Sequence, residues 1–292
     1  MVNILITGGA GYIGTALAER LVREGHNITL YDSLTYGRNS VQRLDAMLER
    51  AIPVSQALLL DIDSHQPSKN FRFVEGDTRD RQLLERVFSE GSFNIVFHLG
   101  ELMGHYRCEK DPALTREVNF IGTKNVVDLA AQHIANLVYN SSSSVYGFRK
   151  NPRVLNENAK LPILANMDNY CLNKVLVEQY IIKVAGENPD FRYIILRPAT
   201  VGGLSARIRL DLLPNHFAYA AIQGRLSLSG PGHYHAVIDI NDLVEAYVAL
   251  INLNFWPNSY FNIGHHNMTR NSIFLIMSPT PNLFCETNII PE

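Results

Sequence analysis

A tyrosine and a lysine one helical turn apart are the residues best suited to acid–base chemistry in this sequence. Tyr170 and Lys174 lie near the start of a predicted helix at 169–185, and a spacing of four puts both side chains on one face. A phenol, with an unperturbed pKa of about 10, is a poor base at neutral pH. A neighbouring ammonium group favours the phenolate. The pair therefore predicts proton transfer with a substrate hydroxyl group.

The run of serines from Ser141 to Ser144 is the second candidate for chemistry. It follows the apolar stretch 137–139, which predicts a buried strand. A serine hydroxyl at the end of such a strand could hydrogen-bond the reacting oxygen and share the movement of its proton. The alternative is a polar loop without a chemical role.

Alternating strands and helices must position these side chains. Short apolar runs predict buried strands, and most of the intervals between them have helical spacing. This alternation predicts an α/β fold with a doubly wound parallel sheet. The predicted strands are 2–6, 27–31, 71–75, 94–99, 137–140 and 193–196. The main predicted helices are 15–24, 79–88, 112–132, 169–185 and 210–221.

A glycine-rich loop joins the first predicted strand to the first predicted helix. Gly8 allows a tight turn, Gly11 lets the backbone approach a pyrophosphate, and Gly14 lets the helix pack close to the sheet. The helix N-terminus offers N–H groups to the phosphates. Asp32 ends the next strand, where a carboxylate can bind an adenosine ribose and repel a 2′-phosphate. The loop predicts NAD rather than NADP, although Arg38 could hold the phosphate of NADP.

Asp77 follows the third predicted strand and has two interpretations. Its carboxylate could meet the adenine amino group at the edge of the sheet. It could instead cap the predicted helix 79–88, because aspartate is a favoured N-cap. Both roles could hold at once.

The composition of the 292 residues disfavours several classes of function. The chain is 46% hydrophobic and 18% charged, and its net charge of −2 comes without a long basic run. Neither nucleic acid nor an anionic membrane is expected as a partner. Cys108, Cys171 and Cys285 lie far apart, which predicts reduced thiols and no metal site. Without a charged leader or an apolar span of membrane length, we expect a cytoplasmic protein.

Seven motifs follow the order and spacing of the extended short-chain dehydrogenase/reductase family and resemble most its nucleotide-sugar epimerase/dehydratase branch. They are TGGAGYIG, GDTRD, VFHLG, NFIGTKNV, SSSSVYG, YCLNK and ILRPATV, within about residues 1–263. The resemblance implies an NAD-binding Rossmann domain at 1–198, with 236–253 packing back on it. It also implies a smaller substrate-binding lobe at 199–292. Members of the branch usually run longer, which leaves the completeness of that lobe open.

The resemblance also implies roles for individual residues. The catalytic set would be Ser142, Tyr170 and Lys174. Cofactor contacts are implied for Gly8, Gly11, Tyr12, Ile13, Gly14, Asp32, Asp77, Thr78, Leu99, Gly100, Asn119, Tyr170, Lys174 and Pro198. Substrate contacts are implied for Ser142, Ser143, Thr200, Arg207, Arg209 and His235. The two helices 112–132 and 169–185 form a homodimer interface in the family, so a homodimer is expected.

One of these positions departs from the family pattern. His235 stands where many members have an arginine that binds the diphosphate. Loss of that arginine weakens the case for a nucleotide sugar, unless Arg207 or Arg209 compensates, because guanidinium groups suit phosphate. A substrate other than a standard nucleoside diphosphate sugar stays open.

The resemblance implies a reaction that begins by oxidising a sugar hydroxyl with NAD. Ser143 and Ser144 stand where dehydratases and decarboxylases often carry acidic residues, which favours epimerisation at C4 through a transient 4-keto sugar. Glu101 replaces an alanine of the family pattern, and its HxGE context is similar to the sulfolipid sugar synthase branch. It could serve as an acid–base catalyst in an elimination, hydrogen-bond a sugar hydroxyl, or be a surface glutamate paired with Arg107 or Lys110.

Three alternatives to an epimerase therefore stay open. A dehydratase or related lyase would use Glu101 as a catalytic group. A simple reductase acting on a steroid-like or flavonoid-like alcohol would consume its cofactor, whereas an epimerase recycles it. A dinucleotide sensor without catalysis would fit the replacement by His235, but the complete set of Ser142, Tyr170 and Lys174 argues against it.

Overall fold

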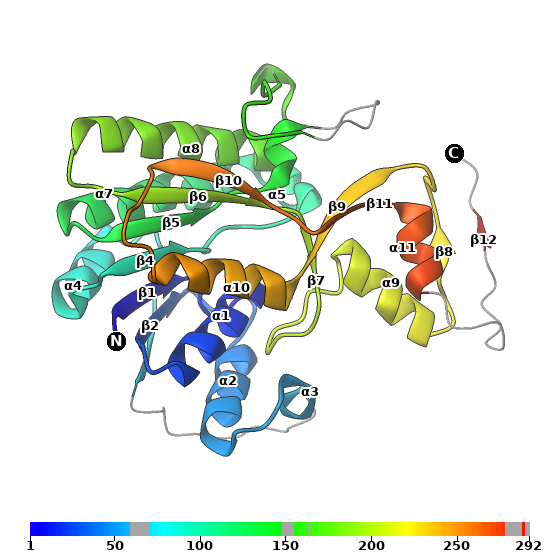
Figure 1. The fold of residues 1–292 in the computed structure, drawn as a ribbon, viewed down its shortest axis with the longest axis horizontal. Helices are drawn as coiled ribbons and strands as arrows, with labels where there is room; N and C mark the ends of the chain where they lie inside the picture. The colour runs from blue at the N-terminus through cyan, green and yellow to red at the C-terminus, as the bar shows by residue number, and fades with distance from the viewer. Residues whose placement is uncertain (59–69, 148–154, 163, 278–287, 290–292) are drawn as a thin grey trace.

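A seven-stranded parallel sheet forms the centre of the protein (Figure 1). The computed structural model describes residues 1–58, 70–147, 155–162, 164–277 and 288–289. The strands lie in the order β10-β6-β5-β4-β1-β2-β3, with the reversal of strand order between β1 and β4. They are β1 (Asn3–Thr7), β2 (Asn27–Asp32), β3 (Phe71–Glu75), β4 (Ile95–His98), β5 (Asn136–Asn140), β6 (Tyr193–Pro198) and β10 (Ser259–Ile263). The six predicted strands and the doubly wound α/β fold are confirmed.

The sheet is buried on both faces, which explains why its strands are continuous apolar runs. Along β1, Ile4 and Ile6 belong to one hydrophobic core, and Leu5 belongs to the other. One face carries α1 (Tyr12–Arg23), α2 (Asn39–Arg50) and α10 (Ile240–Ile251). The opposite face carries α4 (Arg81–Gly91), α7 (Thr123–Gln132) and α8 (Asn169–Glu187).

All five predicted helices have different bounds in the structure, two of them only by a few residues: 79–88 is α4, and 169–185 is α8. The helix expected at 15–24 begins at Tyr12, because Gly11 is its N-cap. The helix expected at 112–132 consists of α6 (Pro112–Thr115), the π-helical η1 (Arg116–Gly122) and α7. The helix expected at 210–221 is α9 (Leu213–Ile222), and it starts later because proline stands in its first turn. The shorter helices are α3 (Val54–Ala57), α5 (His105–Lys110), η2 (Ser143–Tyr146) and η3 (Leu164–Asn166).

A smaller unit lies beside the carboxyl ends of the central strands (Figure 1). Its sheet has the order β11-β9-β7, formed by β7 (Thr200–Gly202), β9 (Tyr234–Asp239) and β11 (His266–Thr269). Helices α9 and α11 (Arg270–Met277) pack against each other around Phe217 and Phe274. Strands β8 (Ser227–Leu228) and β12 (Asn288–Ile289) form a two-stranded pair. The chain between β9 and β11 returns to the main sheet as α10 and β10.

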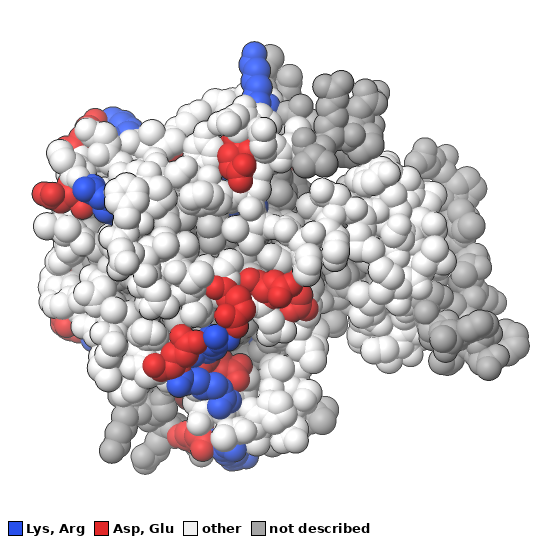
Figure 2. Space-filling view, viewed as in Figure 1, with Lys and Arg blue, Asp and Glu red and all other residues white. Residues whose placement is uncertain are grey.

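Charged side chains of both signs are interspersed on the face shown in Figure 2, over α1 and α10. Arg20 of α1 pairs with Glu24, the C-cap residue of that helix, and with Glu245 of α10, which links the two helices at the surface. Within the residues that the structure describes, no helix is long and apolar enough to cross a membrane.

Candidate active site

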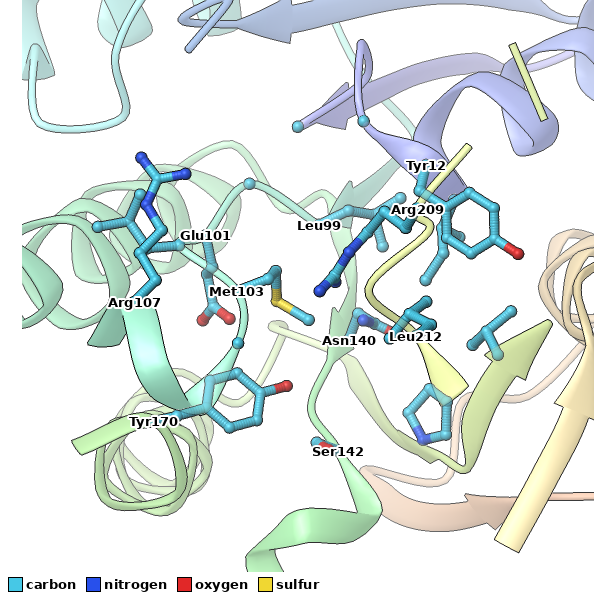
Figure 3. A pocket seen from close by; sticks show the side chains of 18 of the residues that line it. Tyr12, Leu99, Glu101, Met103, Arg107, Asn140, Ser142, Tyr170, Arg209 and Leu212 are labelled. Atoms are coloured by element: carbon cyan, nitrogen blue, oxygen red, sulfur yellow. The ribbon is translucent and has the colours of Figure 1, made fainter. Parts of the chain in front are cut away.

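A cavity of about 850 Å³ lies at the carboxyl ends of β1, β2, β4, β5 and β6 (Figure 3). Its other wall comes from the smaller unit and includes His235 and Arg270. A parallel sheet opens a crevice where its strand order reverses, and this is the usual ligand site of such a fold. All the expected site residues line this cavity except Asn119 and Lys174, which lie behind its wall.

The glycine loop packs so tightly on itself and on Gly100 that a side chain does not fit at two of its positions. Gly8 has a φ of 70°, and a Cβ atom there would lie 2.6 Å from the Cα of Gly100. A Cβ atom on Gly14 would lie 2.4 Å from the carbonyl oxygen of Gly8. No side chain caps the N-terminus of α1, so the N–H groups of its first turn face the cavity. This cradle fits the pyrophosphate of a dinucleotide.

Asp32 lies at the end of β2, where the ribose of such a dinucleotide would lie. Its carboxylate accepts hydrogen bonds from the backbone N–H groups of Ala10, at 3.1 Å, and Leu34, at 2.8 Å. Burial raises the pKa of Asp32, while those N–H groups and Arg207 oppose the rise. Arg38, the residue that favoured NADP, instead pairs with Glu75 on the exposed surface.

The expected capping role of Asp77 is wrong. Helix α4 begins at Arg81, and Asp80 caps it by accepting a hydrogen bond from the Leu83 N–H at 3.0 Å. Asp77 accepts hydrogen bonds from the backbone and the guanidinium of Arg79, and the guanidinium lowers the pKa of Asp77. Asp77 and Thr78 both line the cavity, so the interpretation as an adenine contact stays a prediction.

Asn119 supports the segment that follows β4 without reaching the cavity. Its side-chain oxygen accepts a hydrogen bond from the N–H of Leu102 at 2.7 Å, and its amide donates to the Leu102 carbonyl at 2.8 Å. Leu99 and Gly100, which precede this clamp, line the cavity opposite Pro198 and Thr200. The buried amide therefore fixes the chain beside the expected nicotinamide site.

Tyr170 and Ser142 approach each other at one end of the cavity (Figure 3). Ser142 caps the short helix η2, and its hydroxyl oxygen accepts a hydrogen bond from the Ser144 N–H at 3.1 Å. Burial raises the pKa of Tyr170 above its usual value of about 10, and a hydrogen bond with Ser142 opposes this rise. Ser143 lines the cavity beside them. Two hydroxyl groups are thus available to one reacting oxygen.

Lys174 lies beneath Tyr170 and forms an ion pair with Glu101. Both side chains are only 2% exposed, so the reading of Glu101 as a surface residue paired with Arg107 or Lys110 is wrong. The lysine also donates to the backbone carbonyl of Asn140. One oxygen of Glu101 accepts a hydrogen bond from the Tyr139 hydroxyl at 2.8 Å. The other oxygen meets Lys174 but accepts no well-aligned hydrogen bond from a described residue.

The two expected phosphate-binding arginines point to different ends of the cavity. The guanidinium of Arg207 lies over the ring of Tyr36, 3.7 Å from its centroid, at the Asp32 end. Arg209 pairs with Asp211 and lies near Tyr170, whose pKa its charge lowers. Of the two, Arg209 is therefore the one near the reacting groups (Figure 3).

Sequence reasoning missed Arg270, which lies beside His235 in the cavity wall. Its guanidinium donates to the His235 ring at 3.0 Å and to the carbonyl oxygen of Ser229 at 3.2 Å. This places a cation beside the position from which the family arginine is missing. The signal was the polar stretch around 265–271, but only the pairing of β11 with β9 brings it to His235.

Three potential metal ligands gather at the mouth of the site. Atoms of His105, Asp168 and Cys171 that could bind a metal lie within 4.8 Å of one another. Asp168 also caps α8 through the Cys171 N–H, at 2.8 Å, and hydrogen-bonds His105 at 2.8 Å. Helix capping accounts for this contact without an ion. The ring of His105 packs edge-on against Tyr170, 5.1 Å between centroids.

Comparisons with known proteins agree with this geometry. The chain matches the sequence model of the NAD dependent epimerase/dehydratase family over residues 4–264. It is 32% identical, over 197 residues, to a bifunctional UDP-glucose 4-epimerase and UDP-xylose 4-epimerase of Pisum sativum, which covers 67% of this chain and 51% of the relative. An Arabidopsis thaliana protein with the same pair of activities is 28% identical over 271 residues, 87% of this chain and 72% of the relative.

The fold is shared with solved structures of lower sequence identity. The UDP-glucose 4-epimerase of Thermotoga maritima, solved with UDP-glucose, superposes with a TM-score of 0.79 at 22% identity, covering 99% of this chain and 85% of that one. The UDP-glucose 4-epimerase of Thermus thermophilus, solved with NAD, gives 0.76 at 21% identity, covering 99% and 86%. The chain spans about half the length of the first curated relatives that it matches. The chain belongs to the NAD-dependent epimerase/dehydratase family, and the expectation of NAD as its cofactor is confirmed at that level.

Proposed function

We propose that this protein is a nucleotide-sugar 4-epimerase that inverts C4 of a UDP-sugar through a transient 4-keto sugar. The observation that carries the proposal is the meeting of Tyr170 and Ser142 in the cavity that also holds the glycine cradle. The similarity to curated UDP-glucose 4-epimerases supports both the reaction and the nucleotide.

Tyr170 serves as the base that takes the proton of the sugar 4-hydroxyl and later returns it. Ser142 hydrogen-bonds the same oxygen and shares the movement of its proton. Since burial raises the pKa of Tyr170, the phenolate depends on groups that favour it, namely Ser142 and Arg209. NAD, when bound, would supply the hydride chemistry at C4, removal from one face of the sugar and return to the other.

Residues of the glycine loop and of β2 position the cofactor relative to Tyr170. Gly8 and Gly14 let the loop fold tightly on itself and on Gly100, so that the N-terminus of α1 can bind the pyrophosphate, and Asp32 accepts hydrogen bonds from the adenosine ribose. His98, fully buried beneath the site, hydrogen-bonds Thr7 and Thr123. Burial lowers the pKa of His98 to about 3, so it stays neutral and only braces β1 against the helix behind β4.

Arg209 and Arg270 bind the diphosphate of the substrate in this proposal. Both line the cavity, and Arg270 reaches it beside His235, where it compensates for the missing arginine. Guanidinium groups suit phosphate because their planar fork matches two oxygens at once. Arg207, over Tyr36 and near Asp32, contributes to the adenosine end instead.

Glu101 is the specific observation that favours a second candidate, a nucleotide-sugar dehydratase. Glu101 is a lining residue of the cavity near Tyr170, where an elimination would need an acid–base group. The contacts of Glu101 with Tyr139 and Lys174 favour epimerisation, because they hold the carboxylate as a fixed ion pair.

The test is product analysis by NMR after incubating the purified protein and NAD with UDP-, dTDP- and GDP-sugars. We expect a C4 epimer of a UDP-sugar without net NADH, lost in Tyr170→Phe and retained in Tyr219→Phe, which changes an exposed tyrosine outside the cavity. Loss of water from the sugar would favour the dehydratase, and net oxidation would favour a reductase. No turnover despite NAD binding would contradict the proposal and favour a dinucleotide sensor without catalysis.

We also propose a homodimer formed through η1 and α8. The two helices contact each other, and each exposes a large apolar side chain: Ile121 is 41% and Ile182 is 44% exposed. Light scattering should give twice the mass of the chain, and Ile121→Glu should shift it toward the monomer. A monomer at micromolar concentration would contradict this assembly.

A further inference from the structure

The lysine expected to favour the Tyr170 phenolate has an acidic partner inside the protein. Lys174 and Glu101 form an ion pair in which both side chains are 2% exposed. The Lys174 ammonium lies 5.9 Å from the centroid of the Tyr170 ring. An opposite charge so close to the ammonium counteracts its field at the phenol.

We infer that Glu101 is a positioning residue whose carboxylate cancels the charge of Lys174 at Tyr170, so that proton transfer by Tyr170 requires a higher pH than Lys174 alone would allow. The inference rests on the proposed function only in naming Tyr170 as the base. It assigns Glu101 an electrostatic role through Lys174 and no proton transfer of its own.

The surroundings of Glu101 hold its carboxylate in place. The hydroxyl of Tyr139, a fully buried residue of β5, donates to one carboxylate oxygen at 2.8 Å. The Asn119 amide clamps both backbone groups of Leu102, the next residue in the chain. Lys174 is fixed in turn by the carbonyl oxygen of Asn140 and lies over the Tyr139 ring, 4.8 Å from its centroid. Both partners of the ion pair are therefore fixed in position by the surrounding residues.

Other ionisable groups lie near Tyr170 and the ion pair, and the directions of their pKa shifts are as follows. Arg209 lowers the pKa of Tyr170, and burial raises the pKa of Cys171, the next residue on α8, to about 12. His105 of α5 packs against the Tyr170 ring, and Cys108 of the same helix is a buried thiol whose pKa burial raises. His98 of β4 stays neutral, because burial lowers its pKa to about 3.

The size of the effect follows from the distance. A unit charge 5.9 Å away, at an effective dielectric constant of about 20, shifts a pKa by roughly two units. Removing the Glu101 charge should therefore lower the pH at which Tyr170 ionises by roughly one to two units. Removing the Lys174 charge alone should raise it, and removing both should leave it within about half a unit of its original value.

The experiment measures Tyr170 ionisation in the NAD-loaded protein by the ultraviolet absorbance of the phenolate. Each protein is compared with its own Tyr170→Phe counterpart, so that the other tyrosines cancel. The set is the wild type, Glu101→Gln, Glu101→Asp, Lys174→Met and the double variant Glu101→Gln/Lys174→Met. The pH profile of kcat for the sugar substrate is recorded beside it.

We expect ionisation at lower pH in Glu101→Gln, at nearly the wild-type pH in Glu101→Asp, and close to wild type in the double variant. An unchanged or higher value in Glu101→Gln would overturn the inference, as would a double variant that titrates like Lys174→Met. If a single variant does not fold, the double variant still decides, because it buries no unpaired charge. Failure of sugar turnover with the expected shifts in absorbance would reject the proposed function and leave this inference standing.

Discussion

Breaking the buried pair of Glu178 and Arg197 should strongly destabilise the active-site end of the sheet. The carboxylate of Glu178, on α8, meets the guanidinium of Arg197, on β6, through two contacts, and both side chains are 4% exposed. Ser141 donates to the same carboxylate, and Arg197 donates to the Tyr146 hydroxyl at 2.9 Å. The pair thereby ties the first serine of the run 141–144 to the helix that carries Tyr170.

Glu178→Gln keeps the shape of the side chain but leaves the Arg197 charge buried without its counter-ion. Breaking one partner of a buried pair costs about 3–5 kcal/mol. At about 2 °C per kcal/mol, the low end of the range because this chain is long, the melting temperature should fall by roughly 6–10 °C. The double variant Glu178→Leu/Arg197→Met removes both charges, and it should recover at least half of the loss, because apolar replacements of such pairs are often nearly neutral.

Urea denaturation followed by circular dichroism measures both variants against the wild type. Arg72→Ala is the matched control, because Arg72 pairs with Glu90 on the surface, where such pairs contribute about 0–1 kcal/mol. A loss below about 1 kcal/mol in Glu178→Gln would show that the Arg197 charge does not need its counter-ion. So would a double variant less stable than Glu178→Gln itself.

Three further predictions concern the cavity. Gly14→Ala places a Cβ atom 2.4 Å from the Gly8 carbonyl oxygen, which should distort the glycine loop. The Kd for NAD, measured by calorimetry, should therefore rise at least about tenfold. An unchanged Kd would argue against this loop as the pyrophosphate site. Tyr170→Phe should lower kcat by about 10²- to 10⁴-fold while NAD binding changes little, and a large loss of NAD binding would point to misfolding instead. Arg209→Ala should raise the KM for the nucleotide sugar, an effect that salt reduces, whereas Arg38→Ala, outside the cavity, should leave KM unchanged.

The strands and the glycine loop could be predicted because their signals are local. A strand buried on both faces must be apolar along its whole length, and the alternation of Ile4, Leu5 and Ile6 between two cores is the physical reason. The glycines of the loop are required by backbone contacts within it and with Gly100. Element ends were less certain: Asp80 rather than Asp77 caps α4, because the chain makes one more turn before the helix begins.

The contacts that complete the candidate site could not be predicted, because they join distant segments. The interpretations of Glu101 included a site residue and a surface residue but no ion pair with Lys174, since nothing near it in the sequence reveals its burial against that lysine. Tyr139 looked like one more apolar strand residue, but its hydroxyl reaches the Glu101 carboxylate across neighbouring strands. Arg270 meets His235 only through the antiparallel pairing of β11 and β9.

The most direct test of the central claim follows the hydrogen at C4 of the sugar. The protein and NAD are incubated with UDP-glucose that carries deuterium at C4, and the product is analysed by NMR and mass spectrometry. We expect the C4 epimer with the deuterium retained at C4, because the deuteride that leaves C4 is the one that returns, and far slower formation of this product with Tyr170→Phe. Deuterium lost to solvent in an epimerised product, or loss of water from the sugar, would contradict it.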